Sequence, residues 1–233
     1  MLTLRNIFAD AFQLFYPHVC TGCGSDLLEK DAQLCLSCIH DLPHTGFAAI
    51  PDNIVERVFV GRLPLRAAFS EFYFSKGQLI QYLIHQLKYK NNRTIGHYLG
   101  EMIGNAMLQS RRFSNIDYII PLPMYADKEF KRGYNQAEII CNGIMEATKI
   151  PVMTKNVVRS YATETQTKKH RTERWQNVDG SFNILNPEKL ANKNILLVDD
   201  VITTGATLEA CGQLILKIPG TTLSLAALAY ASK

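Results

Sequence analysis

The sequence predicts an α/β protein in which a mostly parallel sheet is flanked by helices. Two observations carry this prediction. Strand and helix patterns alternate from residue 116 onward, and an apolar run at 195–198 continues through a polar turn into a helical pattern. Alternating strands and helices are typical of a parallel sheet covered on both faces. The 233 residues suffice for one compact domain with a small appendage.

Composition excludes several classes of protein. Hydrophobic residues make up 47% of the chain and charged residues 20%, which is ordinary for a globular protein and excludes disordered and collagen-like chains. No stretch approaches about 18 uninterrupted apolar residues, so no membrane span is expected. The net charge of +4 is too small to indicate nucleic-acid binding unless it is concentrated locally.

The first sixteen residues carry apolar side chains at spacings of three and four, which predicts an amphipathic helix. Arg5 and Asp10 interrupt the apolar residues, so the stretch lacks the unbroken apolar core of a secretory signal. We therefore expect a cytoplasmic protein, in which cysteines stay reduced instead of forming a disulfide framework.

Four of the six cysteines form two C-x-x-C pairs, Cys20 with Cys23 and Cys35 with Cys38. A turn with this spacing can direct two thiolates at one tetrahedral metal ion, and Zn²⁺ is the natural occupant. Four thiolates fill the coordination shell, so we expect a structural zinc site. The alternatives are buried apolar cysteines or a redox pair, and His18 could replace one ligand.

The other elements are predicted from local patterns. Strand-like runs between about 55 and 75, the second with alternating aromatic residues, predict a hairpin. Helical spacing follows at 78–88 and 94–109. Further strands are expected at 116–120, 152–158, 194–198 and 222–229, and further helices at 135–148 and 206–217. We divide the chain into a helix and metal module at 1–50 and a main domain at 51–233.

The most informative segment is 195–207, in which an apolar strand ends at Asp199 and Asp200 and a Thr-Thr-Gly-Ala-Thr turn opens a helix. Ligands of open α/β sheets bind at this edge. Backbone N–H groups, threonine hydroxyls and the positive end of the helix dipole converge there on an anion. A phosphate beside two carboxylates indicates a sugar phosphate whose hydroxyls the acids hold. The simpler alternative is a strand that ends in solvated acids.

Two further segments have geometries that suit a diphosphate. Pro121 and Pro123 make a rigid turn at a strand end, and Arg132 and Gly133 lie in a basic turn before a helix. An ordinary helix start is the alternative for the second segment. A polar stretch at about 160–180 is expected to form a long flexible loop.

The basic excess is concentrated at residues 155–177. Six basic and two acidic side chains there give +4, equal to the excess of the whole chain. Such a segment could neutralise a bound diphosphate sugar or lie along a nucleic-acid backbone. A solvated run of charge is the third interpretation. Trp175 could stack on a base or anchor the loop.

Segment 195–207 resembles the phosphoribosyl diphosphate (PRPP) binding motif of type I phosphoribosyltransferases along its whole length. The resemblance implies the type I phosphoribosyltransferase fold and PRPP with Mg²⁺ as the ligand. It also implies that Asp199 and Asp200 hold the ribose 2- and 3-hydroxyls as the catalytic pair. The loop implied to grip the 5-phosphate consists of Thr203, Thr204, Gly205, Ala206 and Thr207.

With its amino-terminal cysteines, the chain resembles the ComF family over nearly its full length. These are phosphoribosyltransferase-like competence proteins that pair a small zinc module with this fold. The resemblance makes 121–124 the diphosphate loop and 132–136 the family's signature turn, and the hairpin at 55–75 becomes a hood over the site. The residues implied to bind PRPP there are Leu122, Pro123, Arg132 and Gly133; those implied in the flexible loop are Gln166, Arg171, Arg174 and Asn177. One departure is Lys169, where family members often have leucine, which leaves open how that part of the loop packs.

The family resemblance implies a PRPP-binding protein of natural transformation and DNA uptake, with phosphoribosyl transfer to an unknown acceptor as its enzymatic hypothesis. Single-stranded DNA and competence or recombination proteins are the implied partners. The competing interpretation is a non-catalytic protein that binds single-stranded DNA or senses PRPP. A glutamine amidotransferase is not expected, since no cysteine lies near residue 1 and the chain lacks room for a glutaminase domain.

Overall fold

The structure is a computed structural model, and the description below comprises residues 18–29, 32–159 and 181–231. The amphipathic helix predicted at 1–16 lies outside the described residues. So does the loop predicted at 160–180, including Gln166, Arg171, Arg174 and Asn177.

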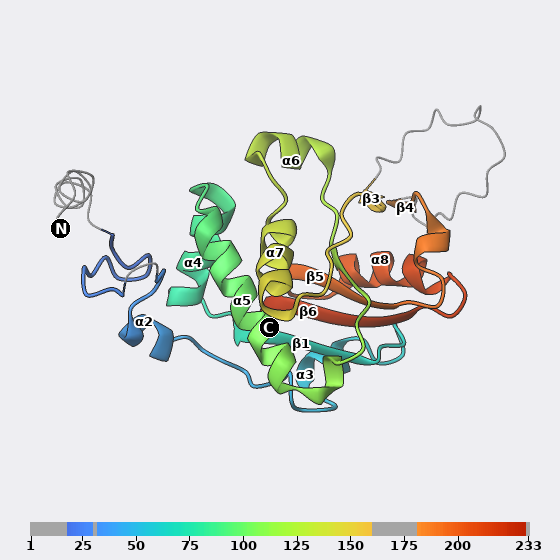
Figure 1. Cartoon of the computed structure of the whole chain (residues 1–233), viewed down its shortest axis with the longest axis horizontal. Helices are drawn as coiled ribbons and strands as arrows, with labels where there is room; N and C mark the ends of the chain where they lie inside the picture. Colours follow the sequence, from blue (N-terminus) through green and yellow to red (C-terminus); the bar gives the residue numbers. More distant parts are fainter. Residues whose placement is uncertain (1–17, 30–31, 160–180, 232–233) are drawn as a thin grey trace, which may run out of the picture.

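A four-stranded parallel sheet forms the centre of the molecule (Figure 1). Its strands, in spatial order, are β1 (Ala67–Tyr73), β6 (Thr222–Tyr230), β5 (Asn194–Ile202) and β2 (Tyr118–Pro121). The two central strands carry continuous buried apolar runs, at residues 195–198 in β5 and 225–229 in β6. Continuous apolar runs of this kind belong to strands covered on both faces. The predicted fold class is therefore confirmed.

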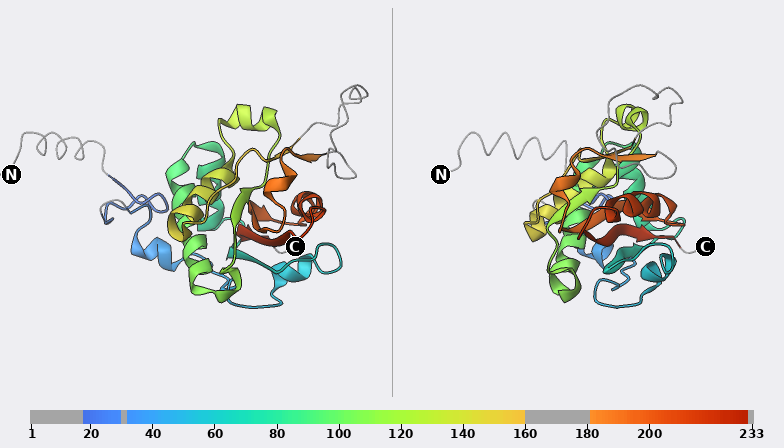
Figure 2. Two further views of the ribbon diagram at one scale, coloured as in Figure 1. Left: turned by 45° about the vertical axis from the view of Figure 1, so that its right-hand side comes forward. Right: turned by 90° about the vertical axis from the view of Figure 1, so that its right-hand side faces the viewer.

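Helices cover both faces of the sheet (Figure 2). On one side α5 (Arg93–Gln109) and α7 (Gln136–Thr148) pack against each other and against the strands, and α8 (Ala206–Leu216) lies on the other side. Glycines let α5 and α7 touch backbone to backbone, because a Cβ on Gly100 would lie 2.2 Å from the carbonyl oxygen of Ile140. All three helices were expected from apolar spacing.

Helix α4 (Leu79–Tyr89) packs against the core, and its last turn lies near the carboxyl end of β5. Ile80, Leu83, Ile84 and Leu87 form its buried face. The shorter elements are α2 (Leu36–His40), α3 (Ile54–Val58), α6 (Ala126–Arg132), β3 (Val157–Arg159), β4 (Phe182–Ile184) and the 3₁₀ turns η1 (Arg111–Phe113) and η2 (Pro187–Lys189). Among the described residues, no helix is long and apolar enough to cross a membrane.

The strand predicted at 152–158 is divided in two. Val152 makes an isolated parallel bridge with Ile119, whereas β3 begins only at Val157 and pairs antiparallel with β4. The single predicted strand therefore serves both the edge of the main sheet and a separate two-stranded ribbon.

The hairpin predicted at 55–75 is wrong. Its first half is helix α3, because Asn53 caps the backbone N–H groups of Val55 and Glu56 through its side-chain oxygen. Its second half is β1, which pairs in parallel with β6 instead of with a neighbouring strand. An alternating apolar pattern identifies a strand but does not identify its partner, and here that partner lies at the far end of the chain.

Candidate functional site

The two predicted carboxylates lie near the carboxyl end of β5, which continues past them to Ile202 instead of ending before them as predicted. Pro121, the last residue of β2, pairs with Val198, so Asp199 and Asp200 extend past the shorter strand. This is the edge at which ligands of open α/β sheets bind. Asp200 is 6% exposed, and its backbone N–H donates to Asp199 Oδ1 at 2.8 Å.

Lys88, near the end of α4, supplies the cation that a buried carboxylate requires. Its Nζ lies 2.8 Å from Asp200 Oδ2. Burial and, next, the negative charge of Asp200 raise the pKa of Asp199 to about 7, while Lys88 and Arg159 oppose this increase. Near neutral pH the Asp199 carboxyl is therefore divided between its neutral and charged forms.

The turn after β5 requires glycine at position 205. Gly205 has a φ of +72°, in the left-handed region, and a Cβ there would lie 2.6 Å from the Phe59 ring. Thr203 and Thr204 before it are exposed, and Thr207 is half-buried. Helix α8 begins at Ala206. Its N-cap residue, Gly205, has no side chain with which to cap the helix. The first turn of α8 thus offers backbone N–H donors to an anion.

Arg62 fixes this turn from the segment that follows α3. One guanidinium nitrogen donates to the Thr204 carbonyl oxygen at 2.9 Å, and the same side chain forms an ion pair with Glu209 of α8. The region predicted to be a hood hairpin therefore supports the turn, through Phe59 beneath Gly205 and Arg62 beside Thr204.

Two neighbouring clefts open next to this strand end. The first, of about 420 Å³, has Asp200 and Thr203 among its lining residues together with Lys88 and Tyr89 of α4. The second, of about 510 Å³, also contains Lys88 and Tyr89. The two clefts therefore meet at the end of α4.

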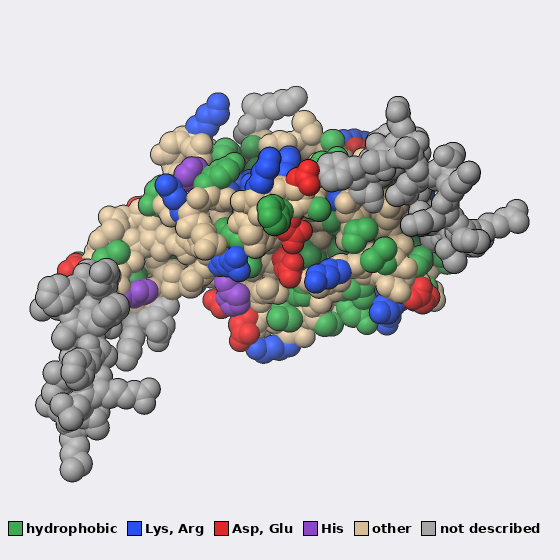
Figure 3. All heavy atoms as spheres, turned by 90° about the horizontal axis from the view of Figure 1, so that it is seen from above, with side chains coloured by type: hydrophobic (Ala, Val, Ile, Leu, Met, Phe, Trp, Pro, Cys, Tyr) green, Lys and Arg blue, Asp and Glu red, His purple; other side chains and the backbone are tan. Residues whose placement is uncertain are grey.

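The second cleft is basic. Its lining comprises Lys88, Tyr89, Asn91, Lys128, Lys131, Arg132 and Tyr134, with no acidic side chain among them. Arg132 lies over the Tyr89 ring, 5.5 Å from its centroid, and donates to Gln136. Gly133 has a φ of +81°, which ends α6 and lets the chain turn into α7. Seen from above, the molecule carries lysine and arginine side chains together with acidic and hydrophobic ones (Figure 3).

The predicted diphosphate loop lines a third, separate pocket. Leu122 is buried, its N–H donates to the Val198 carbonyl oxygen at 2.8 Å, and its own carbonyl accepts from Asn135 Nδ2 at 3.0 Å. Pro123 lines a pocket of about 210 Å³ that also includes Arg159. These contacts hold the loop beside the end of β5.

The structure thus gathers the predicted residues around one end of the sheet but divides them among three hollows. Asp200 and Thr203 line the first, Arg132 the second, and Pro123 the third. Lys88 and Arg62 were not predicted. Lys88 did leave a signal, because it follows buried Ile84 by four residues and so lies on the apolar stripe of α4. Arg62 left none that we recognise.

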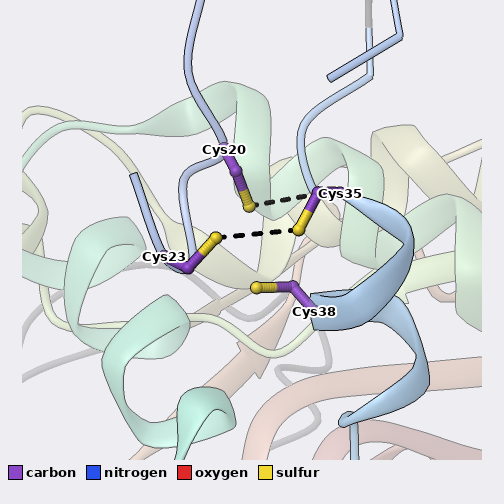
Figure 4. A group of neighbouring side chains, drawn as sticks. All are labelled: Cys20, Cys23, Cys35 and Cys38. Atoms are coloured by element: carbon purple, nitrogen blue, oxygen red, sulfur yellow. Dashed lines mark hydrogen bonds between the residues drawn. The ribbon is translucent and has the colours of Figure 1, made fainter. Parts of the chain in front are cut away.

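The four paired cysteines form a compact cluster in the amino-terminal region (Figure 4). Their sulfur atoms all lie within 4.8 Å of one another, and Cys23 Sγ is 3.6 Å from Cys35 Sγ. Sulfur ligands at about 2.3 Å from a tetrahedral zinc ion are about 3.8 Å apart, so the cluster could hold a metal ion such as zinc. His18 instead contacts the carbonyl oxygen of Ala32 through Nε2, at 2.6 Å.

The cluster also favours ionised sulfur at one position. Burial opposes ionisation of Cys20, but backbone N–H groups of Cys35, Cys23 and Gly22 outweigh it and lower the pKa of the thiol to about 6. Burial, together with the neighbouring thiols, raises the pKa of Cys38. Crowded thiols hinder one another's ionisation, and a bound cation relieves this, since metal ligation releases the protons.

Comparison with known proteins finds relatives among the competence proteins. Competence protein F of Haemophilus influenzae is 27% identical over 203 residues, covering 85% of this chain and 79% of that protein. Competence protein ComFC of Bacillus subtilis is 24% identical over 200 residues, covering 85% and 78%. These relatives support the assignment of the chain to the ComF family.

Two further matches concern the carboxyl-terminal part of the chain and a DNA utilization protein. The phosphoribosyl transferase domain family matches residues 131–233, which include the β5 strand end and the start of α8. The carboxyl-terminal part therefore has a type I phosphoribosyltransferase fold. DNA utilization protein YhgH of Shigella flexneri is 30% identical over 138 residues, which are 58% of this chain and 60% of that protein.

Proposed function

We propose that this ComF-family protein binds PRPP at the carboxyl end of β5. The observation that carries the proposal is the placement of Gly205, which sets the start of α8 beside a buried acid. The first turn of α8 and the hydroxyls of Thr203 and Thr204 bind the 5-phosphate. Asp199 and Asp200 accept hydrogen bonds from the ribose hydroxyls. A helix start alone would bind any phosphate, whereas adjacent carboxylates select a sugar phosphate.

The diphosphate group of PRPP extends from the first cleft into the basic second cleft. Lys88 lines both, so it can contact the diphosphate while it remains close to Asp200. Arg132 adds donors from the end of α6. The Gly133 N–H already donates to the Glu129 carbonyl oxygen at 2.7 Å, and Pro123 lines the separate third pocket. Mutual repulsion among the diphosphate oxygens is offset by these cations.

The donor set also fits Mg²⁺. Carboxylate oxygens are the ligands that this ion prefers, and it is commonly held by one or two carboxylates together with substrate phosphates. Asp199 and Asp200 would hold it. The ion would neutralise negative charge on the diphosphate and so make diphosphate a better leaving group. The acids of this chain also stabilise positive charge at ribose C1 as the bond to diphosphate breaks and an acceptor attacks.

Binding and turnover are tested in sequence. Equilibrium binding of PRPP to the full chain, with and without Mg²⁺, should show one saturable site that Mg²⁺ strengthens. Diphosphate release is then measured with nucleobases and with single-stranded DNA as acceptors. PRPP binding without diphosphate release would support a sensor, and an absence of PRPP binding would contradict the proposal.

A second candidate function is nucleic-acid binding in competence and DNA uptake. The names of the relatives, which include competence and DNA utilization proteins, favour it. The predicted basic segment at 155–177 falls mostly outside the described residues. The proposal therefore rests on the concentration of positive charge in its sequence. Changing Lys168, Lys169 and Arg171 together to alanine should weaken single-stranded DNA binding for all sequences and flatten its salt dependence. An unchanged affinity and salt slope would assign this charge to the small ligand instead.

We also propose that the cysteine cluster binds one structural Zn²⁺, and that the protein acts in the cytoplasm. All six cysteines are free thiols, which suits a reducing compartment. A C₄ set leaves no open coordination position, so zinc here would stabilise the amino-terminal module and leave the chemistry to the strand end.

A further inference from the structure

A separate group of cations lies at the opposite edge of the sheet from Asp200. A pocket of about 200 Å³ there is lined by Ile116 and by six polar or charged residues, which are Arg66, Arg111, Arg112, Ser114, Asn115 and Ser224. Ser224 of β6 pairs with Leu196, three residues before Asp199 on β5. At about 3.3 Å per residue this displacement is about 10 Å along the strand toward its amino end. The pocket is therefore distinct from the proposed PRPP site.

The three arginines come from two segments that the fold brings together. Arg66 immediately precedes β1, and its backbone N–H donates to the Leu223 carbonyl oxygen at 2.9 Å. Arg111 and Arg112 form the η1 turn after α5. Because the residues are far apart in sequence, the concentration of charge arises only in the folded protein.

Two of the guanidinium groups are held in place. Arg112 donates to the Ile50 carbonyl oxygen at 2.9 Å and forms an ion pair with Glu56, with both side chains mostly buried. Arg66 donates to Asn194 Oδ1 at 2.8 Å. Such contacts fix the direction of the remaining N–H donors without consuming all of them, since a guanidinium carries five.

The charge of the pocket is only partly balanced. Glu56 offsets Arg112, whereas neither Arg66 nor Arg111 forms an ion pair with any carboxylate of the described residues. No acidic side chain lines the pocket. Like charges gathered in a hollow repel one another, and a bound anion removes that cost.

We propose that this pocket binds a small phosphate-type oxyanion. The planar guanidinium fork matches two oxygens of such an anion, and Ser114, Asn115 and Ser224 provide polar groups around it. Pockets for drug-sized ligands occupy about 300–1,000 Å³, so this smaller pocket suits orthophosphate or diphosphate better than a whole nucleotide. The inference does not depend on PRPP binding.

The test is a titration of the full chain with orthophosphate, monitored by NMR at the arginine Nε–H groups. Sodium chloride keeps the ionic strength constant. The Nε–H signals of Arg66, Arg111 and Arg112 should shift together and saturate. In the double variant R66Q/R111Q the affinity reported by Arg112 should fall at least about tenfold, because hydrogen bonds to a charged group are lost. Both substituted residues are exposed, so the fold should persist.

The matched control is R57Q/K149Q, which removes two cations that form exposed ion pairs elsewhere. It should bind orthophosphate like the parent protein. Equal losses in the two double variants, or shifts that never saturate, would overturn the proposal. So would saturation by a single-stranded oligonucleotide but not by orthophosphate. Binding of ribose 5-phosphate at the Gly205 amide should be unchanged in R66Q/R111Q, which keeps this test separate from that of the PRPP site.

Discussion

The cysteine cluster and the β5 strand end are built in contrasting ways. All four cysteines come from one stretch of nineteen residues, and a metal ion would hold them together. The strand end instead combines Asp200 with Lys88 from α4 and Arg62 from the segment after α3. The first region depends on ligation and the second on packing of the whole domain. The two should therefore fail under different perturbations.

Metal removal should have the largest effect, and only on the cysteine cluster. Structural zinc sites contribute about 10–16 kcal/mol of apparent binding free energy, far more than so small a module gains by packing. A chelator, or the double variant C20S/C35S, should abolish amide protection at residues 18–41 while β5 stays protected, as measured by hydrogen exchange. Full protection of that segment, with no zinc found by metal analysis, would refute the zinc assignment.

Gly205→Ala should damage the strand end and leave the cysteine cluster intact. A left-handed conformation costs a non-glycine residue about 1–2 kcal/mol, and here the new Cβ would also overlap Phe59. The matched control is Gly46→Ala, which has a φ of +69° but no heavy atom within 4 Å of the added Cβ. Chemical unfolding should show a larger loss for Gly205→Ala, and only this variant should lose PRPP binding. Equal losses of stability in the two variants would contradict this prediction, because they would mean that the Phe59 ring moves aside without cost.

The environment of Asp199 should make the free energy of unfolding depend on pH. The pKa of Asp199 is raised to about 7 in the folded protein, so stability falls as the pH rises from about 4 to about 7. Asp199→Asn removes this loss and should be more stable than the parent at pH 8, by up to about 4 kcal/mol for a pKa increase of about three, with the difference vanishing near pH 4.

Asp117 provides the opposite case. Hydrogen bonding from the Asn194 N–H lowers the pKa of its carboxyl, so its stabilising contribution is present at neutral pH and is lost as the pH falls. Asp117→Asn should therefore cost stability at pH 7 and little at pH 3. Parallel pH profiles for the two asparagine variants would contradict the environment assigned to Asp199.

The smallest expected effect concerns Lys88. The direction in which ribose 5-phosphate affinity changes distinguishes a role in diphosphate binding from a role in supporting the fold. If Lys88 contacts the diphosphate, Lys88→Met should weaken diphosphate binding by about tenfold, the cost of one hydrogen bond to a charged group. Ribose 5-phosphate should bind the variant as well as the parent or better, because Asp200 is freed for the hydroxyls. Titration calorimetry with both ligands measures this difference. Equal weakening of both would mean that Lys88 only supports the fold.

The contrast between the regions also explains what the sequence could predict. The cysteine pairs and the 195–207 turn are local patterns, so the sequence alone indicates their residues, and the structure brings the four cysteines together. The partner of β1 and the side chains of Arg62 and Phe59 are non-local, since their roles depend on segments more than 140 residues away. The same non-locality accounts for the mistaken hairpin, because a strand pattern carries no information about its neighbour.

We propose above that the β5 end and the α8 start together bind a phosphorylated sugar. The most direct measurement compares PRPP and orthophosphate binding at the Gly205 amide, with Mg²⁺ present, for the parent, Asp200→Asn and Thr204→Val. Asp200→Asn should weaken PRPP more than orthophosphate, and Thr204→Val should weaken both by about 1–3 kcal/mol. If both variants bind PRPP like the parent, the ligand lies elsewhere and the claim is contradicted.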